Sequence, residues 1–290
     1  MTDANKTLIV YTDLDGTLLD HNNYSFKEAT PALNQLATMQ VPVIPVTSKT
    51  LSEVISITQE AGLMHPVIVE NGSIIAFPEN YFENKDEYYS DGKYWYKQVS
   101  TSYDVIIKIL EKIRDKTHFN FNGFSDMSVD EVVKYTGLTY SDAENAKQRE
   151  GTEPLIWLGT NEERLIFEKE LHQNDLTLTK GGRFWHVMGR ASKGNAIEIV
   201  NNLYLSNKYE KISTLGLGDS PNDISMLKVV DVPVIVQTID GNYMTFENSD
   251  LCYKTKYPGP KGWSQFLLHY LCTFSDKEHN ELKRERFDHG

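Results

Sequence analysis

The stretch DLDGT, residues 13–17, follows the apolar run LIVY, residues 8–11, with only Thr12 between them. A short apolar run that ends at a turn signal is typical of a buried strand in a parallel sheet. In open α/β sheets the chemistry lies beyond the carboxyl ends of the strands, which is where residues 13–17 would fall. The stretch therefore predicts an α/β fold with functional groups at this edge of the sheet.

Asp13 and Asp15 are separated by one residue, so their carboxylates converge on one small volume. At ~4 Å and an effective dielectric constant near 20 their repulsion is roughly 4 kcal/mol. A divalent cation removes that repulsion, and hard oxygen ligands suit Mg²⁺. Gly16 permits the tight turn, and Thr17 can donate a hydroxyl. From these five residues alone, an ordinary acidic surface turn stays open as the alternative.

Length and composition narrow the class of protein. The 290 residues are enough for two domains, and the formal net charge of −12 argues against a nucleic-acid or anionic-membrane partner. Cys252 and Cys272 are the only cysteines, too few for a disulfide framework or a thiolate zinc site. No signal core or membrane-length apolar stretch is present, so the cytoplasm is the expected location. The oligomeric state stays open.

The chain alternates predicted strands and helices in its first and last thirds. Strands are expected at residues 41–46, 67–69, 212–217 and 232–236, with residues 74–77 returning as a hairpin arm. N-cap signals predict helix starts at Thr30, Thr50, Ser128, Ser141, Asn161 and Ser192. This rhythm is typical of a parallel sheet flanked by helices.

The middle third mixes helices with antiparallel strands at residues 154–158, 176–179 and 183–188. Residues 81–96 fit neither regular period, and the first domain boundary is placed there. We therefore predict a core in two parts, residues 1–83 and 189–274, with an inserted α+β cap domain at residues 84–188. The charged tail, residues 275–290, is expected to be a solvated helix or disordered, without a function.

Polar groups follow several predicted strands, and each supplies a part that phosphoryl transfer through an aspartyl-phosphate needs. Asp13 would attack phosphorus in line, and Asp15 would protonate the leaving oxygen and then activate water. Thr47 would hydrogen-bond a phosphate oxygen, and Lys193 would neutralise phosphoryl charge. Taken alone, Thr47 is typical of a helix cap and Lys193 of a solvated surface lysine. It is improbable that all these groups follow predicted strands by chance.

The predicted metal ligands are Asp13, the backbone carbonyl of Asp15, and Asp219. Asp219 lies in the run GDSPND, residues 218–223, which taken alone reads as an ordinary turn. Asp223, in the same run, would hold a metal-bound water or orient Lys193.

These motifs, at residues 13–17, Thr47, Lys193 and residues 218–223, resemble the haloacid dehalogenase (HAD) superfamily. A domain inserted between the second and third motifs is similar to its C2-capped, Cof-like branch. The resemblance implies a Rossmann-like core, whose parallel sheet is flanked by helices, and an α+β C2 (type B) cap that closes over the site.

More narrowly, the runs TSKT (47–50), ENG (70–72), REGTEP (149–154) and GGRFWHVMG (181–189) resemble the mannosyl-3-phosphoglycerate phosphatase family. The resemblance implies Mg²⁺-dependent hydrolysis of 2-(α-mannosyl)-3-phosphoglycerate to phosphate and mannosylglycerate, a compatible solute. The implied partner is therefore a small phosphorylated glycoside.

Substrate-binding residues follow from this resemblance, and they are Ser48, Lys49, Glu70, Asn71, Arg149, Arg183, His186 and Asn222. The two arginines could clamp a carboxylate or phosphate. A plain turn at residues 70–72 and a satisfied buried His186 stay open as alternatives. Strand alternation would place Arg183 on the side of Trp185, for which core packing is favoured over sugar stacking.

Three other functions stay open. The first is a phosphatase for another sugar phosphate, including glucosyl-3-phosphoglycerate, with the same machinery. The second is a phosphomutase, which would return the phosphoryl group to a sugar instead of releasing phosphate. The third is a catalytically silent sugar-phosphate-binding module, against which the full set of acidic and basic groups argues.

Overall fold

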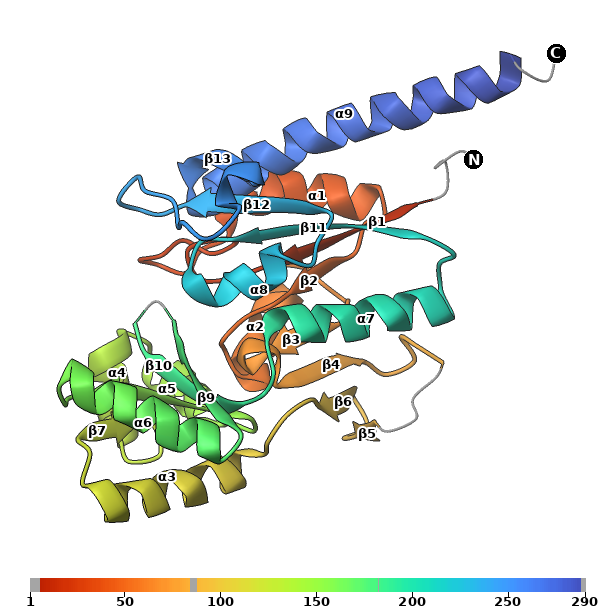
Figure 1. Ribbon diagram of the computed structural model, residues 1–290. Coiled ribbons are helices and arrows are strands. Elements are labelled where there is room, and N and C mark those ends of the chain that lie inside the picture. The colour runs from red at the N-terminus through yellow and green to blue at the C-terminus, as the bar shows by residue number, and fades with distance from the viewer. Residues whose placement is uncertain (1–5, 84–87, 182, 288–290) are drawn as a thin grey trace. The chain divides into compact units, whose positions relative to one another are not determined.

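The computed structural model describes residues 6–83, 88–181 and 183–287 (Figure 1). The chain forms two compact units. The first comprises Met1–Ile44, Asn201–Asp219 and Leu227–Gly290, and the second comprises Pro45–Val200 and Ser220–Met226.

A five-stranded sheet with the order β13-β12-β11-β1-β2 organises the first unit. Strand β1 pairs in parallel with β11, in register from Thr7 opposite Ile212 to Thr12 opposite Leu217. Ile9, Val10 and Tyr11 of β1 are fully buried, which confirms the strand predicted from the opening run. The strands are β1 (Thr7–Thr12), β2 (Val43–Pro45), β11 (Ile212–Gly218), β12 (Val232–Gln237) and β13 (Tyr253–Pro258).

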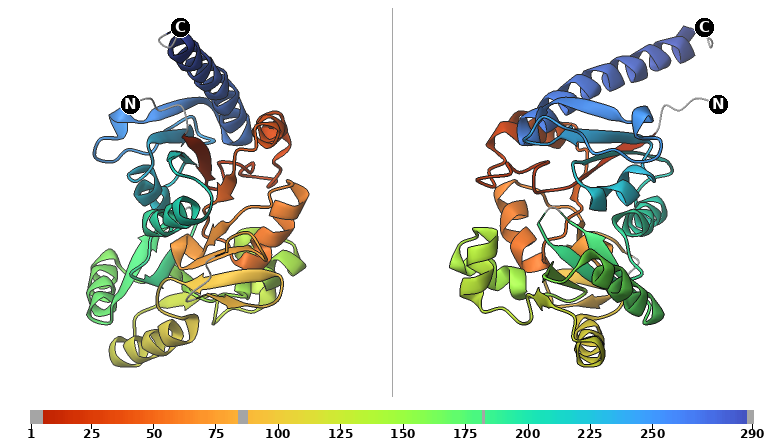
Figure 2. Two further views of the ribbon diagram at one scale, coloured as in Figure 1. Left: turned by 90° about the vertical axis from the view of Figure 1, so that its right-hand side faces the viewer. Right: turned by 60° about the vertical axis from the view of Figure 1, so that its left-hand side comes forward.

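Helices α1 (Thr30–Thr38) and α9 (Gly259–Phe287) pack beside each other in this unit, as the views of Figure 2 show. The indole N–H of Trp263 in α9 is fully buried and donates a hydrogen bond to Thr12 Oγ1 at 3.0 Å. The backbone of α9 is helical to Phe287, so residues 275–287 of the predicted charged tail are helical, and residues 288–290 lie outside the described residues. Short 3₁₀ turns lie at Lys27–Ala29 and Ser249–Leu251.

Two antiparallel sheets organise the second unit, with the orders β3-β4-β6-β5 and β7-β8-β10-β9. The predicted hairpin of residues 67–69 and 74–77 is confirmed, because β3 pairs antiparallel with β4, and the expected antiparallel strands of the middle third include the pair β9 and β10. The first sheet comprises β3 (Val67–Val69), β4 (Ile74–Pro78), β5 (Tyr89–Ser90) and β6 (Tyr94–Gln98). The second sheet comprises β7 (Phe121–Gly123), β8 (Thr152–Trp157), β9 (Leu176–Lys180) and β10 (Trp185–Gly189).

Residues 81–96, which show no regular period in sequence, contain β5 and the start of β6. These strands are too short for a period to show, since β5 has two residues. Cross-strand contact supports the pair, because the Tyr89 and Tyr96 rings stack with centroids 5.3 Å apart.

Local capping sets the helix starts of the second unit. Thr50 and Ser128 form complete capping boxes with Glu53 and Glu131, as predicted. The helices are α2 (Leu51–Glu60), α3 (Tyr103–Thr117), α4 (Val129–Thr136), α5 (Tyr140–Lys147) and α6 (Asn161–Gln173). Helix α7 (Lys193–Asn207) begins directly after Ser192, whose hydroxyl accepts from Asn195 N at 3.1 Å.

Three predicted N-caps are wrong by one or two residues. Thr160 caps α6 in place of Asn161, because its hydroxyl and Glu163 complete both halves of a capping box. Thr139 caps α5 in place of Ser141, since its hydroxyl accepts from Asp142 N. Thr30 is the first residue of α1, after a 3₁₀ turn that ends at Ala29.

Side chains of α3 and α6 bury one face of the β7-β8-β10-β9 sheet. Ile106, Phe167, Leu155 and Val187 of this cluster are fully buried. Trp185 packs against the same cluster, with Arg164 and Lys180 each placed over its ring, 4.6 and 4.9 Å from the centroid. Core packing of Trp185, the favoured expectation, is therefore what the structure has.

Candidate active site

Asp13 follows β1, and its backbone N–H donates to Leu217 O of β11 at 2.9 Å. This bond continues the parallel ladder by one residue past β1, so Asp13 and Asp219 leave neighbouring strands side by side. Asp13 is buried, with 5% of its surface exposed, and Asp15 is half-buried.

The turn after Asp13 closes on Asp219. Thr17 Oγ1 donates to Asp219 Oδ1 at 3.1 Å. Gly16 has φ +80°, and a Cβ there would lie 2.8 Å from Asp219 Oδ2. Because a side chain at residue 16 would have to displace this carboxylate, glycine is required both for the turn and for the approach of Asp219.

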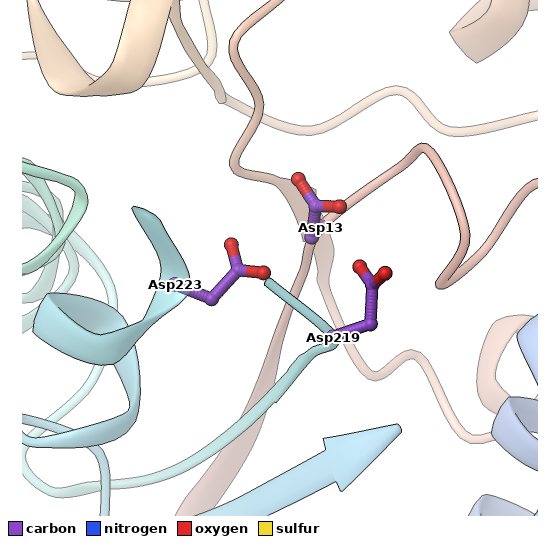
Figure 3. A group of neighbouring side chains, drawn as sticks. All are labelled: Asp13, Asp219 and Asp223. Carbon is purple, nitrogen blue, oxygen red and sulfur yellow. The ribbon is translucent and has the colours of Figure 1, made fainter. Parts of the chain in front are cut away.

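Asp13, Asp219 and Asp223 form an acidic triad (Figure 3). Each offers one carboxylate oxygen, and these three oxygens lie within 4.8 Å of one another. Such proximity is unfavourable for three anions unless protons or a cation compensate their charge. The oxygen donor set fits a hard divalent cation, so the triad could bind a metal.

Lys193 and Asp223 form a buried ion pair. Lys193 Nζ lies 2.5 Å from Asp223 Oδ1, and both side chains are 0% exposed. The second oxygen of Asp223 accepts from Ser220 N at 3.0 Å. Lys193 is therefore not a solvated surface lysine. Asp223 was expected to hold a metal-bound water or to orient Lys193, and the structure has its contact with Lys193.

The loop after β2 begins at Thr47, which is 1% exposed. Its hydroxyl accepts from Lys49 N at 3.2 Å, so it orders the loop that precedes α2. Ser48 is half-buried, and the Lys49 ammonium lies 3.6 Å from Glu53 Oε1.

Glu70 and Arg149 lie in one buried network, with Arg149 Nε 3.6 Å from Glu70 Oε2. The carboxylate of Glu70 accepts from the backbone N–H groups of residues 150, 151 and 152. The guanidinium of Arg149 donates to Thr152 O, Ala146 O and Ser48 O. Both side chains, predicted to bind substrate, are thus engaged by the protein itself.

Asn71 and Asn222 contact each other. Asn222 Nδ2 donates to Asn71 Oδ1 at 2.9 Å. Asn71 is 2% exposed, and its Nδ2 has no hydrogen-bond partner among the described residues. A buried amide donor without a partner is costly, so a ligand oxygen at this point would be stabilised.

His186 in β10 is also buried, with 6% of its surface exposed. Burial, reinforced by the positive charges of Arg149, Lys193 and Lys180, lowers the pKa of His186 to about 3. Its Nδ1 has no hydrogen-bond partner within the described part of the chain. His186 is therefore buried, but its hydrogen-bonding groups are not all satisfied by the described residues.

Arg183 is exposed, and its guanidinium donates to Thr136 O at the end of α4. The strand predicted from residue 183 begins at Trp185, so strand alternation does not place Arg183. The expectation that Arg183 and Trp185 share a strand face is therefore wrong, because Arg183 belongs to the hairpin turn.

Residues 10–242 match the family model of haloacid dehalogenase-like hydrolases. The chain belongs to the haloacid dehalogenase-like hydrolase family. The superfamily resemblance drawn from the motifs is therefore confirmed.

Among the described residues of this HAD hydrolase, no helix combines the length and apolarity that crossing a membrane requires.

Two curated relatives of this HAD hydrolase are named glucosyl-3-phosphoglycerate/mannosyl-3-phosphoglycerate phosphatase. The protein of Persephonella marina is 40% identical over 278 residues, covering 96% of this chain and 99% of the relative. That of Methanococcoides burtonii is 40% identical over 266 residues, covering 90% and 96%. A solved structure from Thermoplasma acidophilum, 19% identical, superposes with a TM-score of 0.65 over 91% of this chain and 98% of its own. The predicted fold class, a HAD core with an additional α+β part, is confirmed.

Gly72 is a residue of the HAD site whose role sequence reasoning missed. A Cβ at Gly72, where φ is +95°, would lie 2.3 Å from Ser192 O and 3.0 Å from Lys193 N. The turn at residues 70–72 therefore packs directly on the start of α7. The run ENG signals a turn, but nothing in it indicates which helix the turn contacts.

We expect His186 to make the protein less stable in acid. An unfolded chain binds a proton at His186 below pH 6.5, whereas the folded chain does not until about pH 3. The free energy of unfolding should therefore fall as the pH drops below 6.5, by about 2 kcal/mol at pH 5 from this group. Urea unfolding at pH 7 and pH 5 measures it.

His186→Gln should reduce the acid-dependent loss by that amount, because glutamine does not titrate. His269→Gln, at an exposed position of α9, is the control and should leave the loss unchanged. Equal losses in wild type and His186→Gln would contradict the assignment of a neutral, buried imidazole.

Proposed function

We propose that this HAD hydrolase is a Mg²⁺-dependent phosphatase that acts on glucosyl- or mannosyl-3-phosphoglycerate and releases phosphate and the glycosylglycerate. The observation that carries the proposal is the 40% identity to the Persephonella marina phosphatase over 99% of that protein. The acidic triad supports metal-assisted phosphoryl transfer.

In the proposed reaction Asp13 attacks phosphorus and forms an aspartyl-phosphate, and the sugar-glycerate oxygen leaves. Asp15 donates the proton that the leaving oxygen takes up, and then accepts a proton from the attacking water. Water hydrolyses the acyl phosphate, which returns Asp13 to its carboxylate form and releases phosphate.

Thr47 and Lys193 are proposed to bind the phosphoryl oxygens. The hydroxyl of Thr47 donates a hydrogen bond, and the ammonium of Lys193, held by Asp223 at 2.5 Å, balances the negative charge. Asp13, Asp219 and the backbone carbonyl of Asp15 would hold Mg²⁺. When bound, Mg²⁺ would reduce the repulsion between the carboxylates and the phosphoryl group.

Substrate recognition is proposed in the first place for Asn71 and His186. Asn71 Nδ2 and His186 Nδ1 support this, because both are buried donors or acceptors without a partner in the described residues. Arg183, Ser48, Lys49 and Asn222 are kept as further candidates. The sheet β7-β8-β10-β9 and its helices are proposed to be the C2 cap, which the sequence predicts at residues 84–188 and whose strand β10 ends at Gly189.

Phosphate release from mannosyl- and glucosyl-3-phosphoglycerate, measured beside a small aryl phosphate, tests the proposal. We expect turnover of at least one glycosyl-3-phosphoglycerate with a higher kcat/KM than the aryl ester. Transfer of phosphate to a sugar without free phosphate would support the phosphomutase instead. Binding of the sugar phosphate without turnover would support the silent binding module.

Removal of Mg²⁺ with EDTA is expected to abolish phosphate release, and added Mg²⁺ should restore it, because the acidic triad needs a cation. Asp219→Asn should raise the Mg²⁺ concentration for half-maximal activity by about 10-fold or more. Asp240→Asn, in an exposed turn after β12, is the matched control. Full activity of the protein in EDTA would contradict the metal requirement.

A further inference from the structure

The turn at residues 70–72 has a left-handed backbone that is unfavourable for its first residue, Glu70. Glu70, Asn71 and Gly72 have φ values of +50°, +57° and +95°, so three successive residues lie in the left-handed region. Glycine and asparagine tolerate this region, whereas a glutamate there is strained. Such strain persists only where the surroundings hold it, and it is concentrated at functional sites.

The carboxylate of Glu70 is what holds the turn. Oε1 accepts from Glu150 N at 2.8 Å, and Oε2 accepts from Gly151 N at 3.0 Å and from Thr152 N at 2.8 Å. Thr152 Oγ1 donates to the same Oε2 at 2.9 Å. Three successive backbone N–H groups therefore converge on one carboxylate, which is 1% exposed.

The same turn fixes the loop that carries Thr47. Asn71 N donates to Thr47 O at 2.8 Å, and Glu70 N donates to Lys49 O at 2.9 Å. Arg149, beside Glu70, donates to Ser48 O at 2.7 Å. Each of the residues 47, 48 and 49 thus has its carbonyl bound to this network.

The turn also fixes the start of α7. Gly72 approaches Ser192 so closely that a Cβ would lie 2.3 Å from its carbonyl oxygen. The neighbouring residue is Lys193. The turn therefore contacts both the loop that carries Thr47 and the helix start that carries Lys193.

We propose that Glu70 is a positioning residue, which sets the separation of Thr47 and Lys193 by anchoring the left-handed turn to the backbone N–H groups of residues 150–152. The inference rests on the proposed phosphatase activity and replaces the sequence-based expectation that Glu70 binds substrate. Its carboxylate is bound by N–H and O–H groups of residues 150–152, so we expect its effect on turnover not to depend on what the phosphate is attached to.

Glu70→Gln tests the proposal, because it keeps the shape of the side chain but turns an amide N–H₂ toward N–H and O–H donors. We expect kcat to fall about 100-fold, with little change in KM. The fall should be equal for a glycosyl-3-phosphoglycerate and for a small aryl phosphate. Activity is measured per folded molecule, well below the urea midpoint of each variant. Glu60→Gln, at the exposed end of α2, is the matched control.

Thr152→Val is the second variant, used if Glu70→Gln does not fold. It removes the hydroxyl that donates to Glu70 Oε2 and accepts two hydrogen bonds from the Arg149 guanidinium, without changing the charge or the volume much. We expect a smaller fall of kcat, again equal for the two substrates.

Two results would overturn the positioning role while the phosphatase activity stands. One is a loss confined to the glycosyl-3-phosphoglycerate, which would make Glu70 a substrate contact. The other is a lowered urea midpoint with kcat unchanged for both esters, which would make its role purely structural. A wild-type protein that releases phosphate from neither ester would overturn the proposed function, and the positioning role with it.

Discussion

Asp13→Asn is expected to abolish phosphate release, with kcat lower by about 10⁴-fold or more. An amide is too weak a nucleophile to attack phosphorus, and it carries no negative charge to bind a cation. The substitution preserves the shape of the side chain at the end of β1, where 5% of its surface is exposed, so the fold should be retained. Single-turnover measurements of phosphate release, with urea unfolding of the same samples, check both expectations.

Asp240→Asn is the control for Asp13→Asn, since it makes the same chemical change in an exposed turn and should keep full activity. Acid quenching of the wild-type enzyme during turnover should also trap phosphate on a peptide that contains Asp13. A variant Asp13→Asn that keeps more than a small fraction of wild-type turnover would remove Asp13 from the role of nucleophile.

Strands and the turns that directly follow them in the chain could be predicted from the sequence. The run at residues 8–11 and the turn at residues 13–17 are adjacent, and the structure has β1 followed by that turn. The second acidic motif also follows an apolar run, at residues 212–217. Because both runs are buried parallel strands, the structure pairs them and brings Asp13 and Asp219 together.

Long-range side-chain partners could not be predicted in the same way. Glu70 and the N–H groups that bind it are about 80 residues apart in the chain, and no local period links them. For Glu70, the family resemblance implies a substrate ligand, and the sequence leaves a plain turn open as the alternative. Only the fold reveals that this carboxylate and Arg149 are occupied by backbone groups.

Three helix N-caps were predicted at the wrong residue for a different physical reason. Threonine, serine and asparagine are all good N-caps, so several adjacent residues compete for one helix start. At α6 the position is decided by Glu163, whose carboxylate accepts from Thr160 N at 2.7 Å. Asn161 precedes that glutamate by only two residues, whereas the capping box needs three.

Lys193→Met is expected to lower both activity and stability, because it leaves Asp223 buried without its cation. Loss of the ammonium should reduce phosphate release by about 10²–10³-fold. Breaking one side of a fully buried pair should lower the free energy of unfolding by about 3–5 kcal/mol. Lys116→Met is the matched control, because the Lys116 side chain is 66% exposed in its pair with Glu170, and it should cost less than about 1 kcal/mol.

The double variant Lys193→Met/Asp223→Asn separates the two losses. Replacing the carboxylate with a neutral amide removes the uncompensated charge, so part of the lost unfolding free energy should return in urea titrations. Phosphate release should stay low, since neither the ammonium nor the carboxylate is restored. Recovery of activity together with stability would mean that Lys193 acts only through the fold. Stability without activity would instead show that the loss of turnover does not come from the fold.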